Sequence, residues 1–129
     1  MQQELIHPEL SYQLTGLFYK THNSLGRFRS EKSYGDALEK LLQENKIEYK
    51  REFSLEPSFT GEGDRRNIPD FIIANKIIID IKAKKFITKE DYNQMQRYLN
   101  AADLKLGLVV NFRNTYLRPK RVINYKKKN

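Results

Sequence analysis

NIPDFIIANKIIIDIKAKK, residues 67–85, is the stretch that decides how we expect this chain to fold. Side chains alternate between the two faces of a strand, so Asp80 and Lys82 would share one face of a strand over residues 77–83. Isoleucines fill most of the other positions, which is typical of a strand covered on both faces. Charged residues are rare in such strands unless they pair with each other or bind an ion.

A hairpin would bring a second acid to Asp80. Residues 68–73 are predicted to form the preceding strand, and residues 74–76 are few enough to close a tight turn. A three-residue loop centred on Asn75 sets Asp70 directly opposite Asp80. Two carboxylates that face each other in so apolar a segment cost stability unless a proton or a cation lies between them. The sequence therefore predicts a metal site.

Length and composition narrow the class of protein. The 129 residues are enough for one hydrophobic core, so we expect a single domain over residues 1–129 with a basic tail at 125–129. The absence of cysteine excludes disulfides, thiol catalysis and cysteine-bound zinc. Carboxylates are left as the main metal ligands, and they favour Mg²⁺ or Mn²⁺. Without a membrane-length apolar run or a signal-peptide pattern, we expect a soluble, cytoplasmic protein that does not bind membranes.

The net charge of +8 is concentrated at the C-terminal end. Residues 1–103 carry sixteen basic and sixteen acidic side chains, whereas residues 104–129 carry eight basic side chains and no acid. Such a block, with tyrosines between the cations, fits a surface that contacts the phosphates of a nucleic acid. For residues 126–128 a solubilising tail is an equally good interpretation, but residues 113–121 precede a further apolar segment and belong to the folded part.

The order of the other elements follows from their periodicity. We expect helices over about residues 8–25, 30–45 and 88–102, strands over 47–55 and 104–112, and a last element, strand or helix, over 116–125. Thr88 and Asp91 are spaced to cap the third helix. A crossover helix before the strand at 104–112 implies a parallel pair within a mixed sheet. The predicted fold is an α/β sandwich.

Two side chains of the first two helices are predicted to face the interior. Glu31 lies on the inward stripe of its helix with Tyr34 and Leu38. It is either a partner of the helix N-terminus, which is the commoner role, or a third carboxylate directed at the strands. The spacing predicts that it lies on the same side of the sheet as the two aspartates. His22 is expected to be a hydrogen-bonded core histidine rather than a metal ligand.

These residues resemble the PD-(D/E)XK nuclease superfamily, with Pro69-Asp70, then Asp80-Ile81-Lys82, and an acid on a helix ahead of the sheet. Within it, the chain is most similar to the family of small proteins named after a GxxExxY motif. The similarity covers roughly residues 10–124 and is carried by five further segments: 22–26, 31–34, 94–99, 107–112 and 120–124. Phe28 replaces the glycine of the naming motif, and Asp80 replaces the glutamate that is usual in this family.

The resemblance implies a restriction-endonuclease-like fold and a metal-dependent phosphodiesterase site. Asp70 and Asp80, with the main-chain carbonyl of Ile81, would bind Mg²⁺, for which Mn²⁺ is a plausible substitute. Lys82 would orient or deprotonate the attacking water and stabilise charge on the phosphate. Glu31 would hold a metal-bound water or a second ion.

The resemblance extends to the third helix and to the basic residues. Gln94 and Tyr98 resemble the Gln-x-x-x-Tyr element of RecB-like nucleases, which helps to fix the lysine and the substrate. The catalytic residues implied are Glu31, Asp70, Asp80, Lys82 and Gln94. The side chains expected to contact nucleic acid are Lys84, Lys85, Tyr98, Arg113, Arg118, Lys120 and Arg121.

We therefore expect a metal-dependent nuclease that hydrolyses phosphodiester bonds, with DNA favoured over RNA as the substrate. One alternative is a non-catalytic module that retains the nuclease fold and binds nucleic acid or a partner protein. A further alternative is a structural domain in which Asp80 and Lys82 form only an internal ion pair. A homodimer or a partner protein would supply specificity that one short domain lacks.

Overall fold

A computed structural model describes residues 6–57, 59–61 and 67–127 of the chain. Its elements are α1 (Pro8–Leu25), α2 (Glu31–Glu44), β1 (Tyr49–Arg51), β2 (Phe71–Ile73), β3 (Ile77–Lys82), α3 (Lys89–Ala102), β4 (Leu106–Asn111) and β5 (Lys120–Ile123). The predicted order of helices and strands is confirmed, and the last element is a strand. Lys128 and the end of the predicted tail lie outside the described residues. Among the described helices, none has the length and apolar character needed to cross a membrane.

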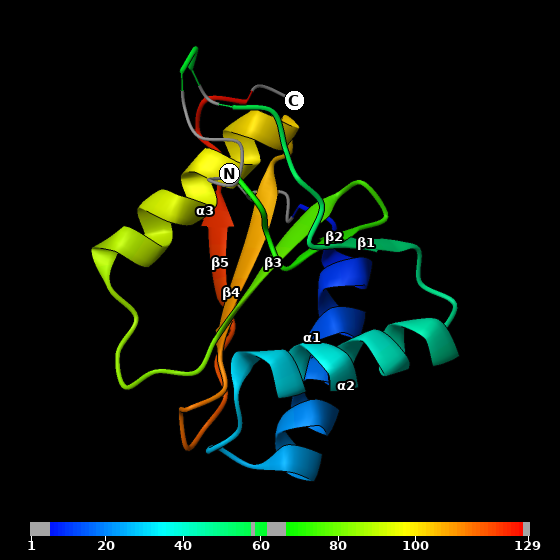
Figure 1. The fold of residues 1–129 in the computed structure, drawn as a ribbon. Coiled ribbons are helices and arrows are strands. Elements are labelled where there is room, and N and C mark those ends of the chain that lie inside the picture. The colour runs from blue at the N-terminus through cyan, green and yellow to red at the C-terminus, as the bar shows by residue number, and fades with distance from the viewer. Residues whose placement is uncertain (1–5, 58, 62–66, 128–129) are drawn as a thin grey trace, which may run out of the picture.

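The strands form one mixed sheet in the order β1-β2-β3-β4-β5 (Figure 1). β1, β2 and β3 are antiparallel neighbours, β3 pairs in parallel with β4, and β5 pairs antiparallel with β4 at the edge. The parallel pair is connected by the crossover through α3, because parallel neighbours need a long connection. The predicted α/β class is therefore confirmed.

Each face of the sheet has its own hydrophobic core. The face that we call the first carries Ile79 and packs against α1 and α2, for example at Leu38. The second face carries Ile78 and packs against α3, where Met95 is fully buried. Figure 1 shows α3 on one side of the sheet and α1 with α2 on the other. β3 is therefore covered on both faces, and a carboxylate within it at Asp80 needs a partner.

The β2–β3 hairpin has the predicted register. Its ladder pairs Phe71 with Ile79, and one step further the same register places Asp70 opposite Asp80. The loop contains Asn75 in the left-handed backbone conformation at φ 54°, which asparagine tolerates better than most residues. Loop length and hydrophobic alternation together fix which acids face each other.

Two strands are shorter than the sequence predicts. The alternation over residues 47–55 predicts one long strand, but β1 ends early because Glu52 adopts a left-handed conformation at φ 52°. β2 begins three residues later than predicted, since Pro69 has no N–H to donate to a ladder. The two segments stay connected, because the Glu52 N–H donates to the Asp70 carbonyl at 3.0 Å.

The helices begin and end within one residue of the predicted bounds. The Thr88 N–H donates to Oδ2 of Asp91 at 2.7 Å, and the Asp91 N–H donates back to the Thr88 carbonyl at 3.0 Å. Ser30 caps α2 by accepting the Ser33 N–H at 3.1 Å. Gly26 ends α1 with φ 78°, a conformation that favours glycine. The capping of α3 fixes where Asp91 lies relative to β3.

Candidate active site

Two carboxylates and a lysine converge where the ends of β2 and β3 meet. Nζ of Lys82 lies 3.1 Å from Oδ2 of Asp80, which is only 4% exposed. Oδ2 of Asp70 accepts the main-chain N–H of Ile81 at 2.6 Å, which holds this carboxylate against β3. The structure therefore brings Asp70, Asp80 and Lys82 together at one place.

The environment of Asp70 disfavours its charged form. The pKa of its carboxyl is raised from 3.8 to about 7. Burial is the largest cause, the negative charge of Asp80 adds to it, and the Ile81 N–H partly opposes it. A hydrogen bond with the Asp80 carboxyl also favours the protonated form. A proton on Asp70 relieves the repulsion between the two acids, and a cation could relieve it in the same way.

Lys82 is held in its charged form. Its Nζ donates to Oε1 of Gln94 at 2.9 Å and lies 3.8 Å from Oδ1 of Asp91. Burial lowers the pKa of Lys82, but the negative charges of Asp80 and Asp91 outweigh it, so this pKa is raised. A protonated lysine can stabilise phosphate charge and orient water, whereas it cannot accept a proton. In the metal-free protein Lys82 is therefore suited to the electrostatic role.

The two α3 residues singled out by sequence lie on the side of the sheet that Asp80 faces. Gln94 fixes Lys82 by accepting its hydrogen bond. Tyr98 is only 5% exposed, and burial followed by the charges of Asp80 and Asp70 raises the pKa of its hydroxyl. The Tyr98 ring is packed in the core on the α3 side of the sheet, so its expected contact with nucleic acid stays a prediction.

Asp91 belongs to this site although sequence reasoning assigned it only to helix capping. Its side chain is buried, and its Oδ2 lies 2.7 Å from Nζ of Lys84. Lys84 was expected to contact nucleic acid, but its ammonium group is engaged in this ion pair. The signal that could have revealed the contact is an acid one turn inside the helix that directly follows the lysines at 82 and 84.

Glu31 does not lie on the side of the sheet that Asp80 and Lys82 face. Its helix packs on the first face, whereas those two side chains point to α3 on the second. Glu31 is exposed and lines a cleft of about 440 Å³ together with Asp70 and Ile81. The predicted placement on the same side of the sheet is wrong, because helical spacing gives the inward stripe of a helix but not which face of a sheet the helix covers. The negative charge of Glu31 nevertheless acts on Asp70 and Lys82 and adds to the causes that raise their pKa values.

The cleft beside Asp70 is acidic. Four carboxylates line it, those of Glu31, Asp36, Glu52 and Asp70, against two cations, Lys32 and Arg51. Arg51 is held there by Asp36 at 2.8 Å and Glu39 at 2.9 Å. Excess negative charge in a concave site raises the local concentration of cations. The cleft therefore favours the approach of a metal ion to Asp70.

The donor set fits a hard divalent cation that retains several waters. No three acidic or histidine side chains of the described residues lie close enough to hold a metal by themselves. Oδ2 of Asp80 is buried and, within the same residues, has no well-aligned hydrogen bond. Mg²⁺ is usually bound by one or two carboxylates plus waters, which matches the pair of Asp70 and Asp80. Glu31 does not join this pair as a third close ligand.

A comparison with protein-family models shows which superfamily this chain belongs to. The model described as PD-(D/E)XK nuclease superfamily matches residues 8–124. The chain belongs to this superfamily. Neither the curated proteins nor the solved structures that we searched contained a match. Nucleases of the superfamily generally use divalent metals, which agrees with the paired carboxylates of Asp70 and Asp80.

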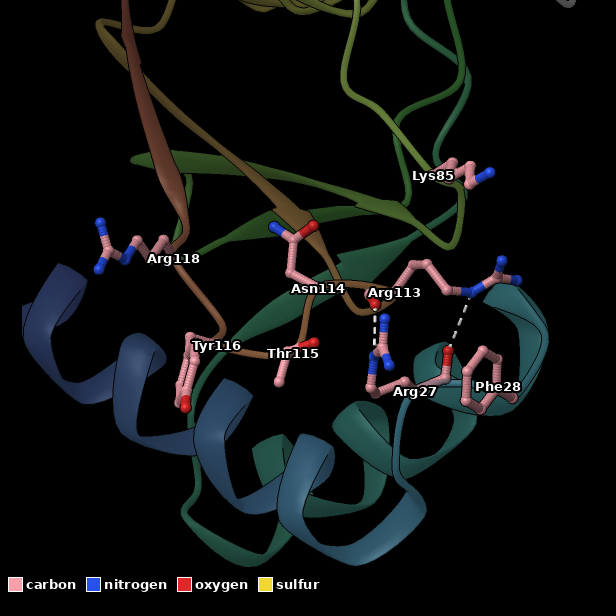
Figure 2. Close-up of a pocket in the computed structure, with 8 residues that line it drawn as sticks. All are labelled: Arg27, Phe28, Lys85, Arg113, Asn114, Thr115, Tyr116 and Arg118. Atoms are coloured by element: carbon pink, nitrogen blue, oxygen red, sulfur yellow. Dashed lines mark hydrogen bonds between the residues drawn. The ribbon is translucent and has the colours of Figure 1, made fainter.

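The basic residues of this PD-(D/E)XK protein that were predicted to contact nucleic acid lie in different surroundings. Three of those predicted to contact nucleic acid line a single pocket (Figure 2): Lys85, Arg113 and Arg118. Lys120 is exposed on the edge strand β5. Arg121 is instead attached to α1, because its guanidinium donates to Oγ of Ser11 at 2.7 Å and to the carbonyl of Ile6 at 3.0 Å.

Two further residues hold the loops of this PD-(D/E)XK domain. His22 Nε2 donates to the carbonyl of Asn114 at 2.9 Å, so the expected hydrogen-bonded histidine is confirmed. Asn111 is 3% exposed, accepts the Lys84 N–H at 3.1 Å and donates to the Lys84 carbonyl at 2.7 Å. Sequence reasoning missed Asn111, because an asparagine at a strand end has no pattern of its own.

Proposed function

We propose that this chain is a metal-dependent nuclease that hydrolyses phosphodiester bonds in DNA, with RNA the less favoured substrate. The observation that carries the proposal is the buried pair of Asp70 and Asp80 beside the charged Lys82. Membership in the PD-(D/E)XK superfamily supports nuclease chemistry, and the pair of acids supports a metal.

In this proposal Asp70 and Asp80 hold Mg²⁺, or Mn²⁺ in its place, with the main-chain carbonyl of Ile81 as a further ligand. Once bound, the ion would polarise the phosphate and lower the pKa of its water. Lys82 neutralises charge that develops on the phosphate oxygens and orients the attacking water. Gln94 keeps the ammonium of Lys82 in position, and Glu31 holds water at the mouth of the cleft.

We also propose that the chain belongs to the GxxExxY family. Glu31 and Tyr34 supply the second half of that motif, and Tyr34 has a defined structural role. Its buried ring stacks on Phe112 at 4.2 Å, and its hydroxyl donates to the carbonyl of Gly26. These contacts hold the segment between α1 and α2, in which the exposed Phe28 stands at the position of the motif glycine.

The contacts with nucleic acid in this proposal come from Lys85, Arg113, Arg118 and Lys120. Residues 104–129 contain no acid, so phosphate contacts there meet little repulsion. A second copy of the chain or a partner protein would add the base-reading surface that specificity requires.

One alternative is a structural domain in which Asp80 and Lys82 form only an internal ion pair, and the 3.1 Å contact between them favours it. That reading leaves Asp70 unexplained. An ion pair between Asp80 and Lys82 gains nothing from Asp70, a second buried acid whose negative charge repels that of Asp80. A metal site, in contrast, uses both carboxylates as ligands.

Titration calorimetry with Mg²⁺ and Mn²⁺ tests the proposal. Wild-type protein should bind the ion, and Asp70→Asn should remove the binding. Asp103→Asn is the matched control, because the Asp103 side chain is 82% exposed at the far end of α3. Metal binding that is absent from the wild type, or unchanged in Asp70→Asn, would overturn the proposed site.

A further inference from the structure

A second pocket on the surface, the basic pocket, is separate from the acidic cleft. It has a volume of about 480 Å³, and Figure 2 shows the residues around it. Its lining includes four cations and two aromatic rings: Arg27, Lys85, Arg113, Arg118, Phe28 and Tyr116. No lining residue is acidic, and none of the four cations forms an ion pair within the described part of the chain.

Two of these cations hold each other in place. Nε of Arg27 donates to the carbonyl of Arg113 at 2.8 Å, and Nε of Arg113 donates to the carbonyl of Arg27 at 3.1 Å. Both guanidinium groups lie over the ring of Phe28, at 4.9 Å and 5.2 Å from its centroid. Two fixed positive charges without a counter-charge repel each other, and a phosphate is the anion whose oxygens match their remaining N–H groups.

One buried stack supports both halves of the basic pocket. The Tyr34 ring stacks on Phe112, the residue before Arg113, with 9° between the ring planes. The Tyr34 hydroxyl donates to the carbonyl of Gly26 and accepts the Arg29 N–H at 3.2 Å. The segment between α1 and α2 and the loop after β4 are thus shaped before any ligand binds, which lowers the entropic cost of binding.

The two aromatic rings of the basic pocket are open to solvent. Phe28 is 73% exposed and Tyr116 is 80% exposed, and Figure 2 shows them on opposite sides of the pocket. Exposed rings beside cations are the arrangement on which bases of a single strand stack. Bases in a duplex already stack on one another, so their faces are not available to such rings.

The basic pocket is attached to the strands that carry the active site. The Arg113 N–H donates to Oδ1 of Asn111 at 3.3 Å, and the same Asn111 side chain bonds both main-chain groups of Lys84. Lys84 lies two residues beyond Lys82. A nucleic-acid strand in the basic pocket would therefore lie near the ends of β3 and β4, next to the proposed catalytic residues.

We propose that the basic pocket binds an unpaired nucleotide of the nucleic-acid substrate. Its phosphate contacts Arg27 and Arg113, and its base stacks on Phe28 or Tyr116. The enzyme then selects substrates that contain a single-stranded segment. This inference rests on the proposed nuclease function, because it assigns the pocket to the substrate of that reaction.

Binding without catalysis tests the inference. Fluorescence anisotropy in EDTA should be measured with labelled oligo(dT) and with a blunt DNA duplex of equal length, over a range of salt concentrations. Wild type should bind the single strand at least about tenfold more tightly than the duplex. Phe28→Ala or Tyr116→Ala, whichever removes the stacking ring, should weaken single-strand binding about tenfold, and Arg118→Ala should lower the log–log salt slope by about 0.7.

The matched controls are Tyr12→Ala, an exposed ring on α1, and Lys40→Ala, an exposed cation on α2, neither of which lines the basic pocket. Both should bind like the wild type, and thermal melts should show that every variant folds. Equal affinity for single strand and duplex, or unchanged binding by both aromatic variants, would overturn the inference and leave the nuclease proposal intact. A wild type that binds no nucleic acid would overturn both.

Discussion

The Asp70 carboxylate accepts the main-chain N–H of Ile81, one residue beyond Asp80, which lies opposite Asp70 in the β2–β3 register. This 2.6 Å bond ties the end of β2 to β3 and keeps the two acids from separating. The fold therefore keeps the two carboxylates close together despite their repulsion. Either a proton on Asp70 or a bound cation relieves that repulsion.

Metal affinity should depend on pH through Asp70. Because its pKa is about 7 in the metal-free protein, a bound ion must displace a proton at lower pH. The apparent affinity for Mn²⁺ should fall about tenfold for each pH unit below about 7 and level off above it. Calorimetry in two buffers of different ionisation enthalpy would measure the number of protons released for each metal ion bound. A metal affinity that does not change between about pH 5 and about pH 7 would contradict the proton–metal exchange.

Stability of the metal-free protein should fall as pH rises. The folded-state pKa of Asp70 exceeds its ordinary value of 3.8, so the folded protein binds more protons than the unfolded chain between about pH 4 and about pH 7. The stabilisation from this proton is full below about pH 4 and is lost as pH rises through about 7. Thermal melts in EDTA should show this trend for the wild type and a weaker one for Asp70→Asn.

Gln94→Ala should lower the rate of hydrolysis rather than substrate affinity. Gln94 accepts the 2.9 Å hydrogen bond that positions the Lys82 ammonium. We expect kcat to fall about tenfold with KM unchanged, since charge stabilisation at the phosphate depends on position. Asn93→Ala, at an exposed neighbouring position on α3, is the control. An equal loss in both variants would mean that α3 itself, not the contact with Lys82, is responsible.

Asp91→Ala should destabilise the fold by about 1 to 2 kcal/mol, the usual cost of a lost helix cap. Burial raises the pKa of Asp91, but the hydrogen bonds from Lys84 and the Thr88 N–H outweigh it, so this pKa is lowered. The charge-dependent stabilisation is therefore present above about pH 4 and is lost as pH falls further. Urea unfolding at neutral and acidic pH would measure it, with Glu90→Ala as the exposed control.

Local signals predicted the central part of this structure. Alternation and the three-residue loop at Asn75 fixed the hairpin register, and the capping box of Thr88 and Asp91 fixed the start of α3. Each of these features depends on residues close together in the chain. The positions of Asp70, Asp80 and Lys82 follow from them.

Contacts between distant segments could not be predicted in this way. The side of the sheet that α2 covers, and hence the place of Glu31, depends on how α1 and α2 pack on the first face. The reciprocal bonds of Arg27 and Arg113 join residues 86 apart in sequence, so the basic pocket has no local pattern. Arg121 likewise donates a hydrogen bond to Ser11, which lies 110 residues away in the sequence, so no local pattern predicts this contact.

The most direct test is cleavage of single-stranded, duplex and branched DNA and of RNA, with Mg²⁺ or Mn²⁺, by wild type, Asp80→Asn and Asp103→Asn. We expect products from the wild type and Asp103→Asn only, and none in EDTA. Asp80→Asn should stay folded within about 1 kcal/mol, since it removes both an attraction to Lys82 and a repulsion from Asp70. Cleavage retained by purified Asp80→Asn, or absent from the wild type on every substrate, would contradict the proposed active site.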